Sequence, residues 1–360
     1  MHTFYIILAI IALIAIVAAI FLSHPQFGRT ARGERRARIQ QSPHFKDEKF
    51  VNETPTTLMT GEDGYLSTMK MWLSGEKLKN LVPKDGDVPV IKSDLKHLPQ
   101  DDDLYVWFGH SSFLLRLSGL TILVDPVFCK GAPVSFVNPM FPGTDYYKPN
   151  MMPDVIDYLI ISHDHWDHLD YETVMELQPR VRHAVCPLGV GEDLEYWGYS
   201  KEQIVEKDWD ETFTADDGIA IHCLPTRHFT GRGIWNPKTM PASWLIETPR
   251  RKVFYTGDGG YSDRFKRFGV QFPDIDLAIM ENGQYDEHWN QIHTMPRLLG
   301  KEVKELGARR FITVHHSKFK LANHPWDEPR RNEQQASDES GIPVIVCKIG
   351  EIVNLSILDA

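Results

Sequence analysis

A short cluster of metal-binding residue types constrains this chain more than any other feature. Residues 163–168 read HDHWDH and follow directly on the apolar run 155–161, VIDYLII. Imidazole nitrogens and carboxylate oxygens are the usual ligands of zinc and similar divalent ions. Because such groups are costly to hold at the end of a buried strand unless something binds them, the pattern predicts a strand that ends in a metal site. The alternative is a polar, exposed loop that happens to be rich in histidine.

The spacing within the cluster divides its ligands into two sets. His163 and His165 are two residues apart, so their side chains point the same way in extended backbone. Asp167 and His168 come after the chain turns and can face a second ion. The hexapeptide therefore supplies four ligands, which is enough to begin two metal sites.

Three more residues of ligand type stand at the ends of predicted strands. His228 follows the run 221–224, Asp258 lies between glycines in YTGDGGY, and His315 ends the run 311–314. Singly, an Asp between glycines is typical of a turn, and a His at a strand end is typical of a surface. In this order after the hexapeptide, they predict that distant strands complete a dinuclear site.

Short strands come in runs with helices between them, which predicts a layered α/β domain with two sheets. Strands are expected on both sides of residues 109–112 within 103–117, and at 120–124, 155–161, 219–224, 243–248, 252–255, 277–280, 311–314 and 342–349. Helices are expected at 171–178, with Asp170 as the N-cap, and at 189–197 and 296–306.

The first residues predict a transmembrane anchor. Residues 4–22 carry no charge and no Pro or Gly, and as a helix they would be ~28 Å long, close to the thickness of a bilayer core. A cleaved signal peptide is the rival interpretation, but residues 1–3 lack a positive charge before the apolar stretch. Five arginines follow closely, at 29, 32, 35, 36 and 38. By the positive-inside rule they predict a single-pass protein of the inner membrane whose catalytic domain faces the cytoplasm.

This organisation gives three parts: an anchor at 1–23, a basic and polar linker and approach arm at 24–60, and a globular domain at 61–360. The net charge of the chain is −10, although residues 1–50 hold seven Lys and Arg against three Asp and Glu. The body is therefore acidic, which argues against a nucleic-acid partner. Its four cysteines form no C-x-x-C pair and are expected to be reduced thiols.

Several motifs resemble the metallo-β-lactamase superfamily of metal-dependent hydrolases. They read WFGHSSFLLRLSG, ILVDPVF, LIISHDHWDHLDYETV, LPTRHF, FYTGDGGY and VHHSKFKLANH, and the likeness covers roughly residues 40–360. Within the superfamily, the chain is most similar to the phospholipase D family that hydrolyses N-acylphosphatidylethanolamine, and it also resembles bacterial lactonases of the ascorbate-6-phosphate type. The resemblance implies an α/β fold, the four-layer αββα sandwich, which would follow the N-terminal transmembrane helix predicted above.

The resemblance also implies a ligand set for two divalent metal ions. His163, His165 and His228 would hold one ion, Asp167, His168 and His315 would hold the other, and Asp258 would bridge them. Zinc is the expected metal, with manganese or iron(II) as alternatives.

Residues beside the ligands receive roles in the same way. His315 is preferred to the adjacent His316 because it stands four residues before Phe319, as the family's ligand stands before an aromatic residue. His293 falls where the phospholipase D has a further active-site histidine, but Ile292 replaces the Gln that precedes it there. Asp125 would orient a ligand histidine, or else only form a turn with the next proline.

These expectations define a hydrolase that uses a metal-bridging hydroxide, with Asp167, Asp258 and His293 as catalytic residues. The anchor favours a phosphodiesterase that acts on phospholipids. The alternative enzyme is a lactonase or phosphoester hydrolase of a small soluble metabolite, and the alternative class is a non-catalytic metal-binding scaffold. Relatives of the phospholipase D type suggest a homodimer.

Overall fold

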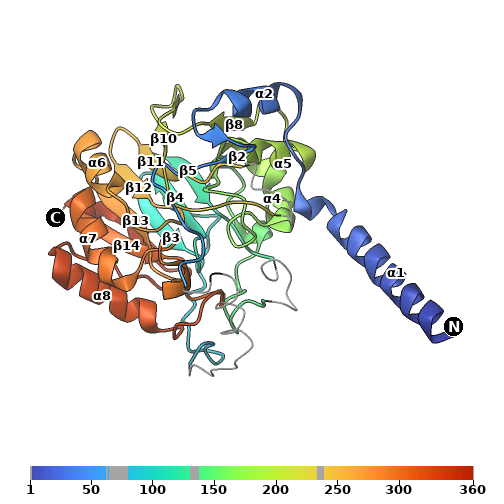
Figure 1. The fold of residues 1–360 in the computed structure, drawn as a ribbon. Helices are drawn as coiled ribbons and strands as arrows, with labels where there is room; N and C mark the ends of the chain where they lie inside the picture. Colours follow the sequence, from blue (N-terminus) through green and yellow to red (C-terminus); the bar gives the residue numbers. More distant parts are fainter. Residues whose placement is uncertain (1, 62–63, 65–79, 130–137, 233–238, 360) are drawn as a thin grey trace.

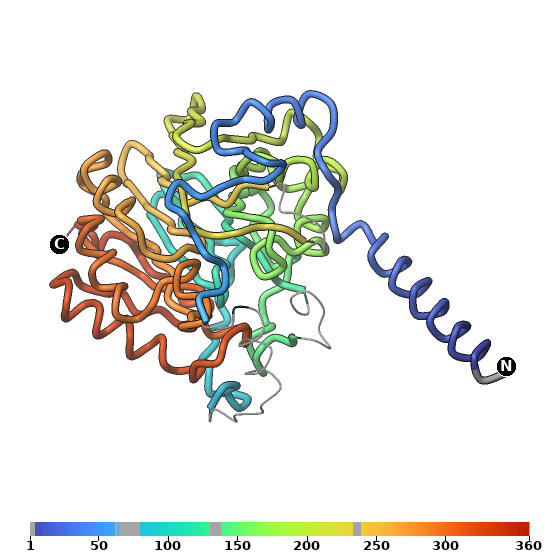
Figure 2. Tube along the Cα trace, viewed as in Figure 1, coloured from blue at the N-terminus to red at the C-terminus, as the bar shows by residue number. Residues whose placement is uncertain are grey.

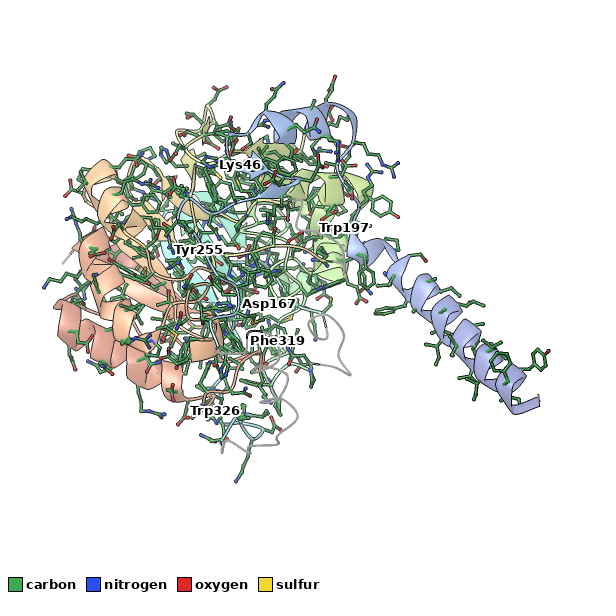
Figure 3. All side chains as sticks on the ribbon, in the orientation of Figure 1. Lys46, Asp167, Trp197, Tyr255, Phe319 and Trp326 are labelled. Carbon is green, nitrogen blue, oxygen red and sulfur yellow. The ribbon has the colours of Figure 1, made fainter. Side chains whose placement is uncertain are left out.

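Two mixed β-sheets lie face to face at the centre of the molecule, with helices on their outer sides (Figure 1). The computed structural model describes residues 2–61, 64, 80–129, 138–232 and 239–359. The expected four-layer αββα sandwich is confirmed. Figure 3 shows Asp167 near the middle of the body, well away from the N-terminal helix.

The first sheet has seven strands in the order β15-β3-β4-β5-β6-β7-β8. Its strands β3 to β5 are antiparallel, whereas β5 to β8 run parallel. The bounds are β3 Leu104–Trp107, β4 Phe113–Leu117, β5 Leu120–Val124, β6 Ile156–Ile160, β7 Val181–Pro187, β8 Ile204–Lys207 and β15 Ile352–Asn354.

The second sheet has six strands in the order β14-β13-β12-β11-β10-β9. Here β12, β13 and β14 are parallel, and the rest are antiparallel. The bounds are β9 Thr212–Thr214, β10 Ala220–Leu224, β11 Ser243–Glu247, β12 Lys252–Tyr255, β13 Leu277–Glu281 and β14 Arg310–Val314.

Strand residues of the second sheet alternate between two hydrophobic cores. Val253 and Tyr255 of β12 face the first sheet, whereas Phe254 between them packs with Phe265 and Leu299 of the outer helices. Side chains on a strand point alternately to its two faces, so an uninterrupted apolar strand is the expected sequence for a sheet covered on both sides. This alternation explains why the strands read as apolar runs.

Helices α6, α7 and α8 cover the second sheet, and α4 and α5 lie beside the first (Figure 1). The helices predicted at 171–178, 189–197 and 296–306 are confirmed as α4, α5 and α7, and Gly307 ends α7 in a left-handed conformation. Among the residues that the structure describes, the α-helices are α1 His2–Leu22, α2 Gly33–Gln41, α4 Tyr171–Leu177, α5 Val190–Tyr196, α6 Arg264–Gln271, α7 Pro296–Leu306 and α8 Glu328–Ser340. The 3-10 helices are η1 Pro25–Phe27, η2 Pro149–Met151, η3 Gln178–Arg180, η4 Glu287–Trp289 and η5 Leu355–Asp359.

The strand expected at 342–349 is not formed. This segment makes only isolated bridges, from Val344 to Phe311 and from Ile349 to Val90. Pro343 has no N–H to donate to a ladder, so pairing beside β14 stops after one residue.

The N-terminal helix α1 projects from the body, and its side chains from Phe4 to Leu22 are exposed (Figure 1). It is long and apolar enough to cross a membrane, and it lies at the N-terminus, where a signal sequence meets the same criteria. The helix is therefore a membrane anchor or a signal sequence.

The segment after α1 folds onto the body and includes α2 and the hairpin β1 (Phe45–Lys46) and β2 (Lys49–Phe50). Figure 2 shows this segment running across the molecule before it reaches the centre. Trp197 Nε1 donates to the carbonyl oxygen of Pro25 at 2.7 Å, and Ile39 is buried. The arm predicted at 24–60 thus forms part of the folded surface.

Arginines of this arm form ion pairs with body carboxylates. Arg35 contacts Glu192, Glu195 and Glu206 at 2.7, 2.9 and 2.5 Å. Further pairs join Arg29 to Glu192 and Arg38 to Glu211, both at 2.6 Å. Three of the five arginines that predict the membrane topology therefore also hold the arm to the acidic body.

Candidate metal centre

The candidate ligands gather where strands of both sheets end. His163 and His165 follow β6, Asp258 follows β12 and His315 follows β14 directly. Parallel pairing puts the carboxyl ends of β12, β13 and β14 together in the second sheet and those of β5 and β6 together in the first. Contacts of Asp258 with His168 and His315 show that the two sets of ends meet at one edge of the sandwich. His228 reaches the same place from four residues beyond β10.

Three imidazoles form the first half of the centre, which we call the triple-histidine half: His163, His165 and His228. His165 Nδ1 lies 2.9 Å from His163 Nε2 and 3.2 Å from His228 Nε2. His228 Nδ1 lies 2.8 Å from the carbonyl oxygen of Ile292. That contact holds the ring with Nε2 turned toward the other two imidazoles.

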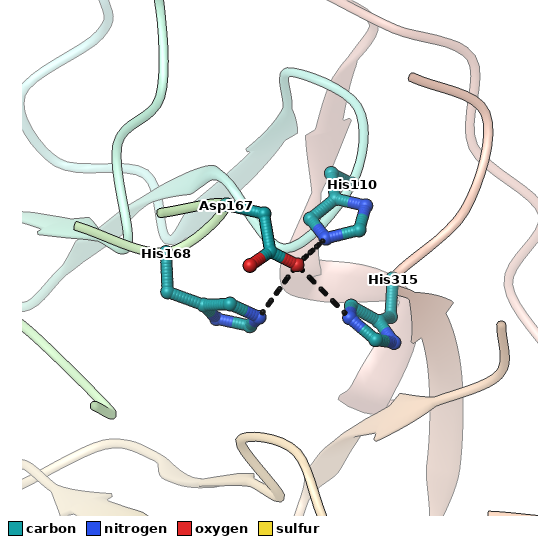
Figure 4. A group of neighbouring side chains, drawn as sticks. All are labelled: His110, Asp167, His168 and His315. Atoms are coloured by element: carbon teal, nitrogen blue, oxygen red, sulfur yellow. Dashed lines mark hydrogen bonds and ion pairs between the residues drawn. The ribbon is translucent and has the colours of Figure 1, made fainter. Parts of the chain in front are cut away.

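The second half, which we call the carboxylate half, consists of Asp167, His168 and His315 (Figure 4). Asp167 Oδ2 lies 3.6 Å from His168 Nε2 and 3.5 Å from His315 Nε2. His110 joins this group, with its Nε2 2.7 Å from the same oxygen. His110 therefore contacts a candidate ligand directly.

Asp258 stands between the two halves. Its Oδ2 lies 3.1 Å from Nε2 of both His168 and His315, and 3.8 Å from Nε2 of both His163 and His228. One carboxylate oxygen therefore approaches imidazoles of both halves. This is the position that a bridging ligand must occupy.

Buried atoms without partners show that the site fits cations. Within the described chain, Asp258 Oδ1 is buried and has no hydrogen-bond partner, and the buried Nε2 atoms of His168 and His315 make no hydrogen bond of good geometry although Asp258 Oδ2 lies 3.1 Å from each. Ligands ~2.0–2.1 Å from a tetrahedral ion stand roughly 3.3 Å apart, which matches the spacings above. The donor set and its geometry thus define a binuclear metal site. The assignment of individual ligands stays a prediction.

The two halves differ in electrostatics. Burial lowers the pKa of His163 and His228 well below the usual histidine value, which keeps these imidazoles neutral. Burial opposes protonation of His168 as well, but the carboxylates of Asp258 and Asp167 raise its pKa to about 10. The carboxylate half of the metal-free chain therefore attracts positive charge.

Close packing requires glycine on both sides of Asp258, and the backbone of His315 is strained. A Cβ on Gly257 would lie 2.5 Å from the carbonyl oxygen of Ala242, and one on Gly259 would lie 2.2 Å from Thr226 Oγ1. His315 has a φ of +72°, an uncommon conformation for a residue other than glycine. Such strain concentrates at functional sites because the surrounding structure must hold it in place.

Asp125 orients a candidate ligand, as expected. Its Oδ2 lies 2.8 Å from His168 Nδ1 and also accepts a 2.6 Å hydrogen bond from the Tyr255 hydroxyl. Its Oδ1 accepts from the backbone N–H of Ser162 at 2.7 Å. A carboxylate held in this way fixes the ring so that Nε2 faces the centre.

Sequence reasoning missed Glu281, the last residue of β13. This carboxylate is fully buried, and its Oε1 contacts Nδ1 of both His293 and His315, the latter at 3.2 Å. Its Oε2 accepts from the backbone N–H groups of Gly259 and Thr294. The signal was an acidic residue at the end of an apolar strand, which the sequence shows in LAIME.

Three residues that are close in sequence to the site residues contact partners outside the centre. His316 Nδ1 lies 2.8 Å from Ser317 Oγ, and its ring packs against Trp107, so His315 is the one that reaches the centre. Trp166 packs under Arg232. Gln291 Oε1 accepts from Arg227, so the amide is already engaged.

A cavity of about 310 Å³ opens onto both halves. Its lining includes polar groups of the centre, among them His165, Asp167, Asp258 and His293. Its lining also includes apolar side chains, those of Leu58, Met59, Phe229, Trp289, Ile292 and Leu321. The cavity thus joins a metal site to an apolar surface.

Comparison with known proteins places the chain in a family. The β-lactamase superfamily domain matches residues 121–316. An uncharacterized protein of Mycobacterium tuberculosis, Rv0906, is 31% identical over 326 residues, which cover 89% of this chain and 86% of that protein. The chain therefore belongs to the metallo-β-lactamase superfamily, and it is a metal-dependent hydrolase of that superfamily.

Two further similarities bear on fold and function. N-acyl-phosphatidylethanolamine-hydrolyzing phospholipase D 1 of Caenorhabditis elegans is 28% identical over 313 residues, which cover 80% of this chain and 86% of that enzyme. The metallo hydrolase Igni18 of Ignicoccus hospitalis superposes with a TM-score of 0.51 at 20% identity, over 70% of this chain and 97% of that protein. The latter supports the fold alone.

Proposed function

We propose that this protein is a membrane-anchored phosphodiesterase that hydrolyses phospholipids on the head-group side. The observation that carries the proposal is the cavity, because metal-binding groups and apolar side chains line it together. A phospholipid presents a phosphodiester next to long apolar chains, so it matches both kinds of lining group. The similarity to the phospholipase D of C. elegans supports the same substrate class.

The centre fits two divalent ions, and zinc suits its nitrogen-rich donor set. His163, His165 and His228 would hold one ion, Asp167, His168 and His315 the other, and Asp258 would be shared. Such ions supply a nucleophile from water at neutral pH and stabilise negative charge on phosphoryl oxygens.

His293 would move a proton in this reaction. Its Nδ1 contacts Glu281, which leaves Nε2 for a substrate, and the residue lines the cavity. A protonated Nε2 can donate to the leaving oxygen of the ester. Asp167 and Asp258 contact the imidazoles of His168 and His315 and can orient the attacking water.

The helix α1 supplies the third part of the proposal. As a retained anchor in the inner membrane, with the body on the cytoplasmic side, it would hold the cavity near a surface where phospholipids are concentrated. The concentration of a soluble metabolite is not raised at the membrane surface, so an anchor would not favour such a substrate.

A substrate screen tests this function. Metal-loaded full-length protein in mixed micelles is offered N-acylphosphatidylethanolamine, phosphatidylcholine, soluble bis(p-nitrophenyl) phosphate and a sugar-phosphate lactone. We expect phospholipid cleavage to dominate and to release phosphatidic acid, and Asp258→Asn to remove it. Faster turnover of the lactone or the soluble ester would favour the metabolite hydrolase, and a metal-loaded protein inert to all four would favour the scaffold.

A further inference from the structure

A second cavity of about 310 Å³ lies beside the metal cavity. The two share three lining residues, Leu58, His228 and Phe229, so they meet next to the triple-histidine half. The remaining wall of the second cavity comes largely from the arm, at residues 49–56. The arm therefore builds a compartment that the superfamily core alone does not supply.

Most polar side chains that line this cavity already have partners within the protein. Asn52 Oδ1 accepts from the backbone N–H of His228 at 3.2 Å, and Thr230 Oγ1 donates to the carbonyl oxygen of Thr239 at 2.6 Å. Trp209 Nε1 donates to the carbonyl oxygen of Pro241 at 2.7 Å. What the wall offers an occupant is apolar surface, from Phe50, Val51, Pro55, Leu58, Trp209, Phe229 and Pro241.

We propose that this second cavity binds a linear alkyl chain of the substrate whose ester group lies at the metal centre. This inference rests on the proposed function. It states that the cavity lined by the arm binds the alkyl chain of the lipid. A chain that enters past Phe229 exchanges water for the apolar wall, while Asn52, Thr230 and Trp209 keep their partners within the protein. Each buried CH₂ group then strengthens binding about fourfold.

Alkylphosphonates test the cavity apart from catalysis, because their C–P bond resists hydrolysis. Calorimetry with the metal-loaded full chain in lipid nanodiscs, against protein-free nanodiscs, gives the affinity for methyl-, butyl-, hexyl- and octylphosphonate. We expect the octyl compound to bind at least about a hundredfold more tightly than the methyl compound. A flat series, or no binding by any member, would overturn the proposal.

Variants of Val51 locate the chain. Val51→Phe fills the cavity and should reduce the ratio of octyl to methyl affinity at least tenfold, whereas Val51→Ala enlarges it and should preserve the preference for long chains. Val155→Phe adds the same bulk at an exposed site outside both cavities and serves as the matched control. An equal ratio in Val51→Phe and Val155→Phe would contradict the assignment.

The screen and the binding series fail independently. If the octyl preference depends on Val51 but no phosphodiester is cleaved, the alkyl cavity stands and the proposed reaction fails. If phospholipids are cleaved but the phosphonate series is flat, the reaction stands and the cavity assignment fails.

Discussion

The two halves of the metal centre present the same number of side chains but differ in charge. Three neutral imidazoles make up the triple-histidine half, and one of them, His228, is held by a backbone carbonyl. In the carboxylate half, Asp125 holds His168 and Glu281 holds His315. A cation gains more from the second environment. The comparison teaches that the halves should fill in order, the carboxylate half first.

Asp258→Asn should have the largest effect, because one oxygen approaches imidazoles of both halves. We expect activity to fall by more than the roughly 100-fold that follows from loss of a residue that only orients ligands. Metal analysis by mass spectrometry should show that the binding of both ions is weakened. Retention of two tightly bound ions would contradict the role of Asp258 as a ligand shared by the two halves.

Paired single variants separate the halves. His163→Ala should leave one tightly bound ion in the carboxylate half, whereas Asp167→Asn should leave only weak binding, because it removes a negative charge. A metal titration of each variant under the same conditions measures the difference. Equal losses of affinity would show that the halves do not differ in the way their charges predict.

Asp125→Asn sharpens the comparison by removing an orienting charge and leaving every candidate ligand intact. We expect about 10- to 100-fold weaker binding of one ion and no change in the other. Asp157→Asn, a change of the same kind on β6 at a residue paired with Arg182, is the matched control. A similar loss in both variants would indicate general destabilisation.

The pH dependence of metal binding should also belong to the carboxylate half. Since the pKa of His168 is about 10 in the metal-free chain, its ring carries a proton at pH 8 that the ion must displace. Burial opposes protonation of His315, but Asp258 and Asp167 raise its pKa as well, so apparent affinity should rise at least about tenfold per pH unit from 7 to 9. Calorimetry at pH 8 in buffers of different ionisation enthalpy should detect the released proton, and binding without proton release would oppose this account.

Glu281→Gln should have the smallest effect. The amide keeps the shape, and its oxygen can still accept a hydrogen bond from His293, but its NH2 group then faces the N–H groups of Gly259 and Thr294, and the charge that both rings share is lost. We expect turnover to fall about tenfold while both ions remain bound. Unchanged turnover would show that the charge of Glu281 does not contribute to the reaction.

Local patterns sufficed to predict much of the fold and the seven candidate ligands, although not their neighbours His110 and Glu281. The run 155–161 with its histidines, Pro296 and Gly307 at the ends of α7, and the glycines around Asp258 each carry their structural reason within a few residues. Because parallel strands bring their carboxyl ends together, residues as distant as His163 and His315 meet at one edge.

Features set by tertiary contacts escaped prediction. Glu281 reads as an isolated acid until β13 takes its place between β12 and β14. The arm reads as a linker because its attachment depends on ion pairs such as Arg35 with Glu206, whose partners are about 170 residues away. The run 342–349 is apolar enough for a strand, but its neighbour pairs with it at a single residue.

Anomalous diffraction from crystals of the zinc-loaded full chain tests the central claim most directly. We predict two peaks, one beside the triple-histidine half and one beside the carboxylate half, each ~2.0–2.2 Å from its ligand atoms and with Asp258 reaching both. A single peak, or two peaks that leave Asp258 without contact to either ion, would contradict the account.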